Sequence, residues 1–386
     1  MNIGYGFWGF LGDKKFDKHG NEISTPDGNA FYSWSIIRGL QKAGHEVYAL
    51  MPDRDAPGVE KVGQNLFKTF AMDERYEAYG LTMNYIDYDY YLEDILKNNV
   101  KLENIIDIGD DEKLDAVIWE WRMPIPGRNI GLSIDAPSFQ PDYALQDILL
   151  NYFKRNHIPV YIFDLDYKVT DEDIEKYNIA GIIELGVKWK DYRKCKTTSV
   201  YIPFGFDCIN EFEIKKPTEL MVYVGNRYER DWCIDKYIPG DVEGVTVYGN
   251  WLEGGRDSAE KWPNINFGKR LQLSEMYDAY SKASVTPLLA KKEYCEHSFM
   301  TARLIEAVFY GCLPLLIEEF EFPGVYLEND LVDLLTIHSK EELIEKAKYF
   351  MEHPDERKEI IRILRHELRI FDAKHFVEDF MNMHNE

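Results

Sequence analysis

The 386-residue sequence has no long apolar run and few cysteines. No stretch of about 18 consecutive apolar residues occurs, so the sequence offers no candidate transmembrane helix. The N-terminal segment MNIGYGFWGFLGD has neither the basic start nor the apolar centre of a signal peptide, and we expect a cytoplasmic protein. Five scattered cysteines without a CxxC pair predict reduced thiols, not a disulfide framework or a zinc site.

Positive charge is also scarce. The chain has 45 Lys and Arg against 68 Asp and Glu, a formal net charge of -23. This balance argues against a protein that coats nucleic acid with its whole surface, because such binding depends on Lys and Arg contacts to phosphate. A polyanion contact must therefore be local. The segment KWKDYRKCK is one candidate for DNA binding, and a solvated surface is the other interpretation; its basic residues are Lys188, Lys190, Arg193, Lys194 and Lys196.

The hydrophobic content of 45% and the chain length predict a globular protein with two domains. Strand-like and helix-like patterns alternate on both sides of the connector YIPFGFD, residues 201–207. In the first half, strands are predicted at 2–6, 45–51, 115–121 and 159–166, and helices at 30–44 and 142–156. In the second half, strands are predicted at 219–226, 245–250 and 284–290, followed by a helix and a strand within 296–320. This alternation predicts two α/β domains with mainly parallel sheets.

Ligands bind such sheets at the carboxyl ends of the strands. In the first domain these ends carry carboxylates, including Asp164 and Asp166, which suit a proton acceptor. In the second domain they carry glycines and basic residues, which suit a diphosphate. The residues concerned are Gly225, Asn226, Arg227, Arg230, Gly268, Lys269 and Arg270.

The segment EHSFMTARLIEAVFYGCLPLLIEEF predicts a helix, a glycine stop and a buried strand. Leu304, Ile305 and Val308 share one side of this helix, whereas Arg303 and Glu306 lie on the other. One interpretation is a surface ion pair, worth only about 0.2–0.5 kcal/mol. The other is a ligand clamp, because the helix follows the carboxyl end of the strand SVTPLLA.

These patterns resemble the GT-B glycosyltransferases, and more narrowly the DNA beta-glucosyltransferases of T-even phages, which glycosylate 5-hydroxymethylcytosine. The resemblance is concentrated in residues 261–320, with matches upstream in MVYVGNRYERD and VTVYGN and looser ones in DAVIWEW and HIPVYIFDLD. It implies two Rossmann-like domains that face each other across a cleft. We expect an acceptor domain at 1–203, a donor domain at 204–367 and a C-terminal helix at 368–386 that returns to the first domain.

The resemblance also implies roles for individual residues. Arg303 would bind the diphosphate of a UDP-sugar and Glu306 its ribose diol, with Tyr294 as a further phosphate contact. Gly225 and Asn226 match a phosphate-binding loop, and Arg227 and Arg230 are both candidates for the arginine that contacts phosphate there. Gly268, Lys269 and Arg270 would present backbone groups to the uracil, while Asn29 and Arg122 are candidates for sugar or acceptor contacts.

The general base implied by the resemblance is an aspartate after the strand YIFDLDY. Both Asp164 and Asp166 stay candidates, since strand alternation places them on the same face; Asp166 lies farther toward the cleft and is favoured. Capping of the following turn is the alternative for either residue. The implied reaction is direct displacement with inversion, with arginines in place of an obligatory metal.

Three functions are open at this point. The first is transfer of a sugar to 5-hydroxymethylcytosine in double-stranded DNA, in which the base would be flipped into the cleft. The second is GT-B glycosylation of a small molecule, lipid or polysaccharide, which the net charge of -23 favours. The third is a non-catalytic nucleotide-sugar-binding protein. We expect a monomer in each case, and the sequence does not identify the sugar.

Overall fold

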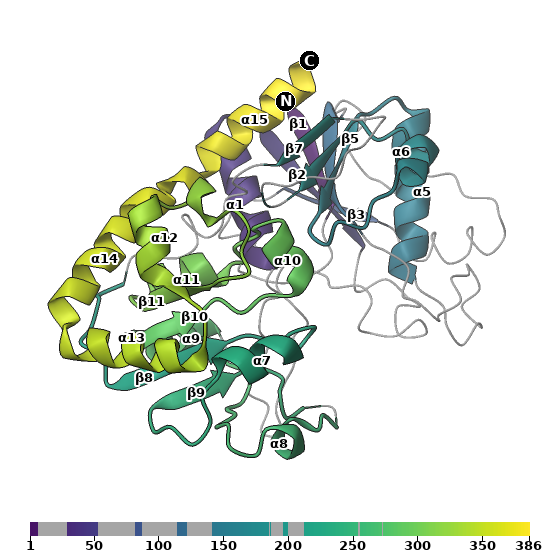
Figure 1. The fold of residues 1–386 in the computed structure, drawn as a ribbon. Helices are drawn as coiled ribbons and strands as arrows, with labels where there is room; N and C mark the ends of the chain where they lie inside the picture. The colour runs from purple at the N-terminus through teal and green to yellow at the C-terminus, as the bar shows by residue number, and fades with distance from the viewer. Residues whose placement is uncertain are drawn as a thin grey trace.

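The computed structural model describes residues 1–6, 29–52, 82–86, 114–121, 141–184, 186, 196–199, 212–253, 255–271 and 273–386. Within these ranges the strands form two separate sheets (Figure 1), and every strand pair is parallel. The predicted class, two α/β domains with parallel sheets, is confirmed.

The first sheet has seven strands in the order β3-β2-β1-β4-β5-β6-β7. Its strands are β1 (Asn2–Gly6), β2 (Glu46–Pro52), β3 (Thr82–Ile86), β4 (Ala116–Glu120), β5 (Val160–Asp164), β6 (Gly181–Glu184) and β7 (Lys196–Ser199). The described helices of this domain are α1 (Asn29–Lys42), α5 (Pro141–Arg155) and α6 (Asp171–Tyr177). Every residue of β4, β5 and β6 is buried, as expected for strands covered by helices on both faces.

The second sheet has five strands in the order β12-β11-β10-β8-β9. They are β8 (Glu219–Val224), β9 (Val245–Tyr248), β10 (Ala283–Pro287), β11 (Leu313–Ile317) and β12 (Thr336–Ile337). Its helices are α7 (Asp231–Tyr237), α8 (Ser258–Lys261), α9 (Leu273–Lys282), α10 (Lys292–Glu296), α11 (Arg303–Phe309), α12 (Asn329–Leu335), α13 (Lys340–Glu352) and α14 (Pro354–Glu367), with a 3-10 turn η2 (Pro323–Val325). Buried β10 and β11 form the centre of this domain.

The C-terminal helix returns to the first domain. After the 3-10 turn η3 (Leu368–Phe371), α15 (Ala373–Asn385) runs beside α1 and ends near the N-terminus (Figure 1). A Cβ atom on Gly39 would lie 2.6 Å from the Cβ of Ala373, so the two helices approach closely where Gly39 lacks a side chain. Farther along, the hydroxyl of Tyr161 is 2.9 Å from Nδ1 of His384. The expected boundary at 203/204 falls outside the described residues.

Several predicted element ends differ from those in the structure, and two of these differences bear on the candidate site. The strand predicted at 159–166 ends at Asp164, because the buried carboxylate of Asp164 accepts hydrogen bonds from the backbone N–H groups of Asp166 (3.3 Å) and Val169 (2.7 Å). The chain therefore turns, and the expectation that Asp164 and Asp166 share a strand face is wrong. In 296–320 the described helix α11 begins only at Arg303 and ends before Gly311, which has a φ of +81°.

Candidate functional site

The strand order of the second sheet creates a switch point between β8 and β10. Strand β9 lies on one side of β8, whereas β10, β11 and β12 follow on the other. The chain therefore leaves β8 and β10 in opposite directions, and in open α/β sheets ligands bind in the crevice that such a switch point forms at the carboxyl ends of the strands. The first residues after these strands are Gly225 and Leu288.

Arg303 spans this switch point. Its Nε donates to the carbonyl oxygen of Val224 at the end of β8 (2.9 Å), and its Nη1 donates to the carbonyl oxygen of Leu289 just after β10 (3.1 Å). Nη1 also donates to Oγ1 of Thr301 (2.9 Å). As the first residue of α11, Arg303 thus places a guanidinium between the two strand ends.

Arg230 lies beside Arg303. Its Nε donates to the same Leu289 carbonyl (3.3 Å), and its Nη1 donates to the carbonyls of Asn226 (3.1 Å) and Tyr228 (2.9 Å). Burial and the charge of Arg303 lower the pKa of Arg230. In the part of the chain that the structure describes, neither arginine forms an ion pair with a carboxylate. Two adjacent cations held only by neutral groups make a site suited to an anion.

The backbone at Gly225 is in close contact with this arginine pair. A Cβ atom on Gly225 would lie 2.7 Å from Nε of Arg303 and 2.5 Å from the hydroxyl of Tyr223. At Gly249, which has a φ of +145°, a Cβ atom would lie 2.2 Å from the carbonyl oxygen of Gly225. Glycine at position 249 therefore lets the two loops pack together, and glycine at position 225 leaves room for the side chains of Arg303 and Tyr223.

Arg227 is placed differently from Arg230. Its guanidinium binds two carboxylates: Nη2 is 2.7 Å from Oδ2 of Asp231, and Nη1 is 2.5 Å from Oδ1 of Asp257. Its backbone N–H donates to Oδ1 of Asn250 (3.1 Å). Arg227 thus ties the loop after β8 to the loop after β9 and to α7. Its assignment as a donor contact stays a prediction, as does that of Asn226, whose Oδ1 accepts a hydrogen bond from the backbone N–H of Asn250.

The segment 268–270 lies beside the end of β9. A Cβ atom on Gly268 would lie 2.4 Å from the ring of Tyr248, and the carbonyl of Lys269 accepts a hydrogen bond from the N–H of Gly249 (3.4 Å). The ammonium of Lys269 is exposed and pairs with Glu275, whereas Arg270 is half-buried. The backbone of residues 268 and 269 therefore packs against the end of β9. The interaction of this segment with uracil stays a prediction.

Glu306 is a buried carboxyl one turn after Arg303. The hydroxyl of Tyr280 donates to its Oε2 at 3.4 Å. Burial raises the pKa of Glu306 to about 7, while Arg303 and Tyr280 offset part of this rise. An ion pair between Glu306 and Arg303 is not found among the described residues, so their spacing does not reflect a surface salt bridge. Glu306 can accept hydrogen bonds from a ligand that reaches the switch point.

Asp166 of the first domain contacts the second domain. Its Oδ1 accepts hydrogen bonds from Nζ of Lys291 (2.8 Å) and the hydroxyl of Tyr294 (3.0 Å). Burial and the Asp166 carboxylate raise the pKa of Tyr294 well above its usual value, whereas nearby Arg230 lowers it. The Tyr294 hydroxyl therefore keeps its proton and donates. Tyr294 thus binds Asp166 and also lies near enough to Arg230 for the charge of that arginine to lower its pKa.

Asp164 and Asp166 differ in surroundings. Asp164 is 1% exposed, and its two carboxylate oxygens accept the turn hydrogen bonds described above. The side chain of Asp166 is 42% exposed. Asp164 thus acts as the turn cap that sequence analysis considered for either residue, and Asp166 is the more exposed of the two carboxylates.

Further contacts join the domains around the site. Tyr32 of α1 is buried between Phe163 of β5 and Phe299 of the second domain, with ring centroids 6.3 and 6.2 Å away. The ring of Tyr167 stacks on His297 with centroids 3.9 Å apart. Sequence analysis missed Tyr32 and Lys291, because neither belongs to a motif and their contacts arise only when the two domains meet.

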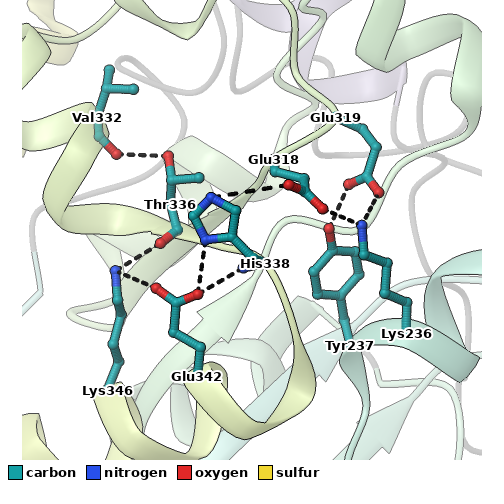
Figure 2. Close-up of polar contacts among 9 residues, drawn as sticks. All are labelled: Lys236, Tyr237, Glu318, Glu319, Val332, Thr336, His338, Glu342 and Lys346. Carbon is teal, nitrogen blue, oxygen red and sulfur yellow. Dashed lines mark hydrogen bonds and ion pairs between the residues drawn. The ribbon is translucent and has the colours of Figure 1, made fainter.

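A polar network fixes the loop after β11 (Figure 2). Glu318 and Glu319 in this loop both pair with Lys236 of α7, and the hydroxyl of Tyr237 donates to Glu319 at 2.6 Å. Nδ1 of His338, just after β12, is 2.9 Å from Oε2 of Glu342. Farther along this loop, the backbone N–H of Glu321 donates to the carbonyl oxygen of Cys295 in α10, and the backbone N–H of Phe322 donates to Oγ of Ser298. The network thus supports the segment that carries Lys291 and Tyr294.

The structure does not test the residues predicted to contact the sugar, the acceptor or DNA. Asn29 is the first residue of α1, and Arg122 lies outside the described residues. The basic segment 188–196 lies outside them as well except for Lys196, which begins β7. The positions not described there are Lys188, Lys190, Arg193 and Lys194. No group of three or more His, Cys, Asp or Glu residues suited to a metal ion occurs within the described ranges, and no helix within them is long and apolar enough to cross a membrane.

Comparisons with known proteins agree with this architecture. Residues 232–382 match the family model described as "Glycosyl transferase-like". Among solved structures, beta-glucosyltransferase of phage T4 is 13% identical with a TM-score of 0.60, and the alignment covers 100% of both chains. Sucrose-phosphate synthase of Thermosynechococcus elongatus is 10% identical with a TM-score of 0.56, covering 99% of this chain and 98% of that one. Anabaena HepE, solved in complex with UDP-glucose, is 9% identical with a TM-score of 0.52 and 99% coverage of both chains.

A search of curated proteins finds no match. The structural likeness extends over the whole chain and shows the fold, and the family match covers the part of the chain that contains Arg303 and Glu306. The helix α15 that crosses back to the first domain completes the predicted arrangement. Together, the two Rossmann-like domains, the returning helix and the full-length structural likeness show that the chain has the GT-B fold, and its residues 232–382 match a glycosyl transferase-like family model.

Proposed function

We propose that this protein transfers a sugar from a UDP-sugar to the hydroxymethyl group of 5-hydroxymethylcytosine in double-stranded DNA. The observation that carries the donor half is the pair of arginines at the β8/β10 switch point, of which Arg230 is buried and Arg303 half-buried. Arg230 and Arg303 share the carbonyl of Leu289 and have no carboxylate partner among the described residues. A diphosphate supplies the negative charge that such a pair lacks.

The remaining donor contacts follow from this placement. Glu306, one turn along α11 from Arg303, accepts hydrogen bonds from the ribose diol. Because Glu306 is buried, acceptor positions on its carboxylate that lack a hydrogen-bond donor cost free energy. The backbone at Gly268 and Lys269 offers groups to the uracil. Two T4 beta-glucosyltransferase structures contain uridine nucleotides, one in the presence of uridine diphosphoglucose and one with UDP and Mn²⁺, which supports the choice of uridine.

Asp166 is the proposed general base. It takes the proton from the acceptor hydroxyl, whose oxygen attacks the anomeric carbon as the bond from that carbon to the UDP oxygen breaks. Attack from the side opposite the leaving group inverts the configuration. The charge that develops on UDP is stabilised by Arg230 and Arg303, which hold fixed positions before the reaction begins.

The acceptor assignment rests on the resemblance of residues 261–320 to DNA beta-glucosyltransferases and on full-length coverage in the structural comparison. A second candidate is transfer to a small molecule, lipid or polysaccharide. The net charge of -23 favours this alternative, because it disfavours long DNA contacts. Both candidates use the same donor site and the same base.

An acceptor panel tests the proposal. The protein is incubated with UDP-glucose, UDP-galactose, UDP-N-acetylglucosamine or UDP-xylose and with duplex DNA that contains cytosine, 5-hydroxymethylcytosine or 5-hydroxymethyluracil. The DNA is then digested to nucleosides, and their masses are measured by mass spectrometry. We expect a mass gain of one sugar on 5-hydroxymethylcytosine with at least one donor. Donor hydrolysis with unmodified DNA, or transfer to small acceptors alone, would support the second candidate, and UDP binding with neither reaction would leave a non-catalytic binding protein.

A further inference from the structure

Lys291 is a buried lysine whose place in the fold calls for an explanation. It is the N-cap residue of α10, and its side chain is only 5% exposed. A buried ammonium is costly unless charged or hydrogen-bonding partners compensate for the lost water. Lys291 also lies two residues after Leu289, whose carbonyl binds both arginines of the donor site.

The principal partner of Lys291 belongs to the other domain. Its Nζ is 2.8 Å from Oδ1 of Asp166 and 3.3 Å from Oε2 of Glu293, and it lies 4.2 Å from the centre of the Tyr294 ring. Burial would lower the pKa of Lys291, but the hydrogen bond and charge of Asp166, together with Glu293, outweigh it and raise the pKa above its ordinary value. The ammonium is therefore charged throughout the neutral pH range.

The hydrogen bonds on Asp166 are asymmetric. Oδ1 accepts from both Lys291 and Tyr294. For Oδ2, no protein donor occurs among the described residues. A carboxylate held through one oxygen presents the other oxygen in a defined direction, and a general base needs this arrangement to meet an acceptor hydroxyl.

We propose that Lys291 is a positioning residue for the reaction: it holds Oδ1 of Asp166 and thereby aims Oδ2 at the acceptor hydroxyl. This inference rests on the proposed function, in which Asp166 is the base. Because Lys291 lies on the segment that also binds Arg230 and Arg303 through Leu289, one stretch of chain couples the position of the base to the donor site.

The charge balance argues against Lys291 as a diphosphate ligand. Its ammonium already has two carboxylate partners, Asp166 and Glu293. Arg230 and Arg303 have only neutral partners in the described structure. An arriving diphosphate is therefore bound by the arginines, and Lys291 keeps its contact with the base.

The test compares Lys291→Met, Lys291→Arg and the matched control Lys292→Met, whose side chain is the exposed neighbour on the same turn. Steady-state kcat and donor KM are measured on the acceptor that wild type modifies, and the Kd for UDP is measured by titration calorimetry. We expect Lys291→Met to lose between about tenfold and about 100-fold in kcat, since a misplaced catalytic group costs this much. Its Kd for UDP stays within about twofold of wild type, and Lys291→Arg recovers most of the kcat because it restores the hydrogen bond to Asp166.

Other outcomes overturn the inference in distinct ways. An unchanged kcat in Lys291→Met removes the positioning role, and a raised Kd for UDP with unchanged kcat makes Lys291 a donor ligand. Equal losses in Lys291→Met and Lys291→Arg, together with a lowered Tm in both, make the contact structural. Asp166→Asn, assayed in parallel, separates this inference from the proposed function: if it keeps full activity the proposed base is wrong, whereas if it is inactive and Lys291→Met is normal only the inference about Lys291 fails.

Discussion

Glu306→Gln should change how stability depends on pH, because Glu306 is a buried carboxyl whose pKa is raised from 4.5 to about 7. Between these two values the folded chain holds a proton that the unfolded chain has lost. Each pH unit of this difference corresponds to about 1.4 kcal/mol, so the free energy of unfolding falls by about 3 kcal/mol in total as pH rises from about 4.5 to about 7. The stabilising contribution is present below pH 4.5 and is lost above pH 7.

Glutamine has nearly the same shape as glutamate and does not titrate, so the variant lacks this decline. The free energy of unfolding is measured by urea titration of tryptophan fluorescence at pH 5, 6, 7 and 8. We expect the variant to gain about 2–3 kcal/mol relative to wild type between pH 5 and pH 8. Other groups with shifted pKa values contribute equally to both proteins and cancel in the difference.

Glu296→Gln provides the matched control, because Glu296 is an exposed glutamate on α10. Its difference from wild type should stay within about 0.5 kcal/mol over the same pH range. At pH 8 Glu306→Gln should also bind UDP more weakly, since a carboxylate accepts hydrogen bonds from a ribose diol more strongly than an amide does. A stability difference that does not vary with pH would refute the buried, proton-binding state of Glu306.

Two further substitutions test the packing around the site. Gly225→Ala places a Cβ atom 2.7 Å from Nε of Arg303, so it should displace the guanidinium and weaken UDP binding by at least about tenfold by calorimetry; unchanged affinity would contradict the placement of Arg303. Asp164→Asn loses one of the two acceptors for the turn at Asp166 and Val169, and should lower the free energy of unfolding by about 1–3 kcal/mol in urea titration. A stable but inactive Asp164→Asn would instead support Asp164 as the base.

Much of the fold could be predicted from the sequence, because its central strands are short apolar runs bounded by turn residues. The strands PVYIFD and LPLLI are of this kind, and both are fully buried. Strand β7 was missed, since KTTS is polar and lies at the edge of its sheet. Local polarity in such a strand gives the same signal as a solvated loop.

The candidate site was predictable only in its local parts. Arg303 and Glu306 belong to one helical segment, and their spacing of three residues by itself indicates a shared helix face. The distinction between Asp164 and Asp166 depended instead on hydrogen bonds within a turn, which strand alternation does not predict. The contact of Lys291 with Asp166 joins residues 125 positions apart and depends on how the two domains meet.

The central claim is that the crevice between β8 and β10 binds the diphosphate of a UDP-sugar through Arg303 and Arg230. Titration calorimetry of UDP into wild type and into Arg303→Met tests it most directly. We predict a Kd in the micromolar range for wild type and a loss of about 100-fold in the variant, the equivalent of about 3 kcal/mol for a charged contact that is removed. Equal affinity in the two proteins, or no binding of UDP by wild type, would contradict the account.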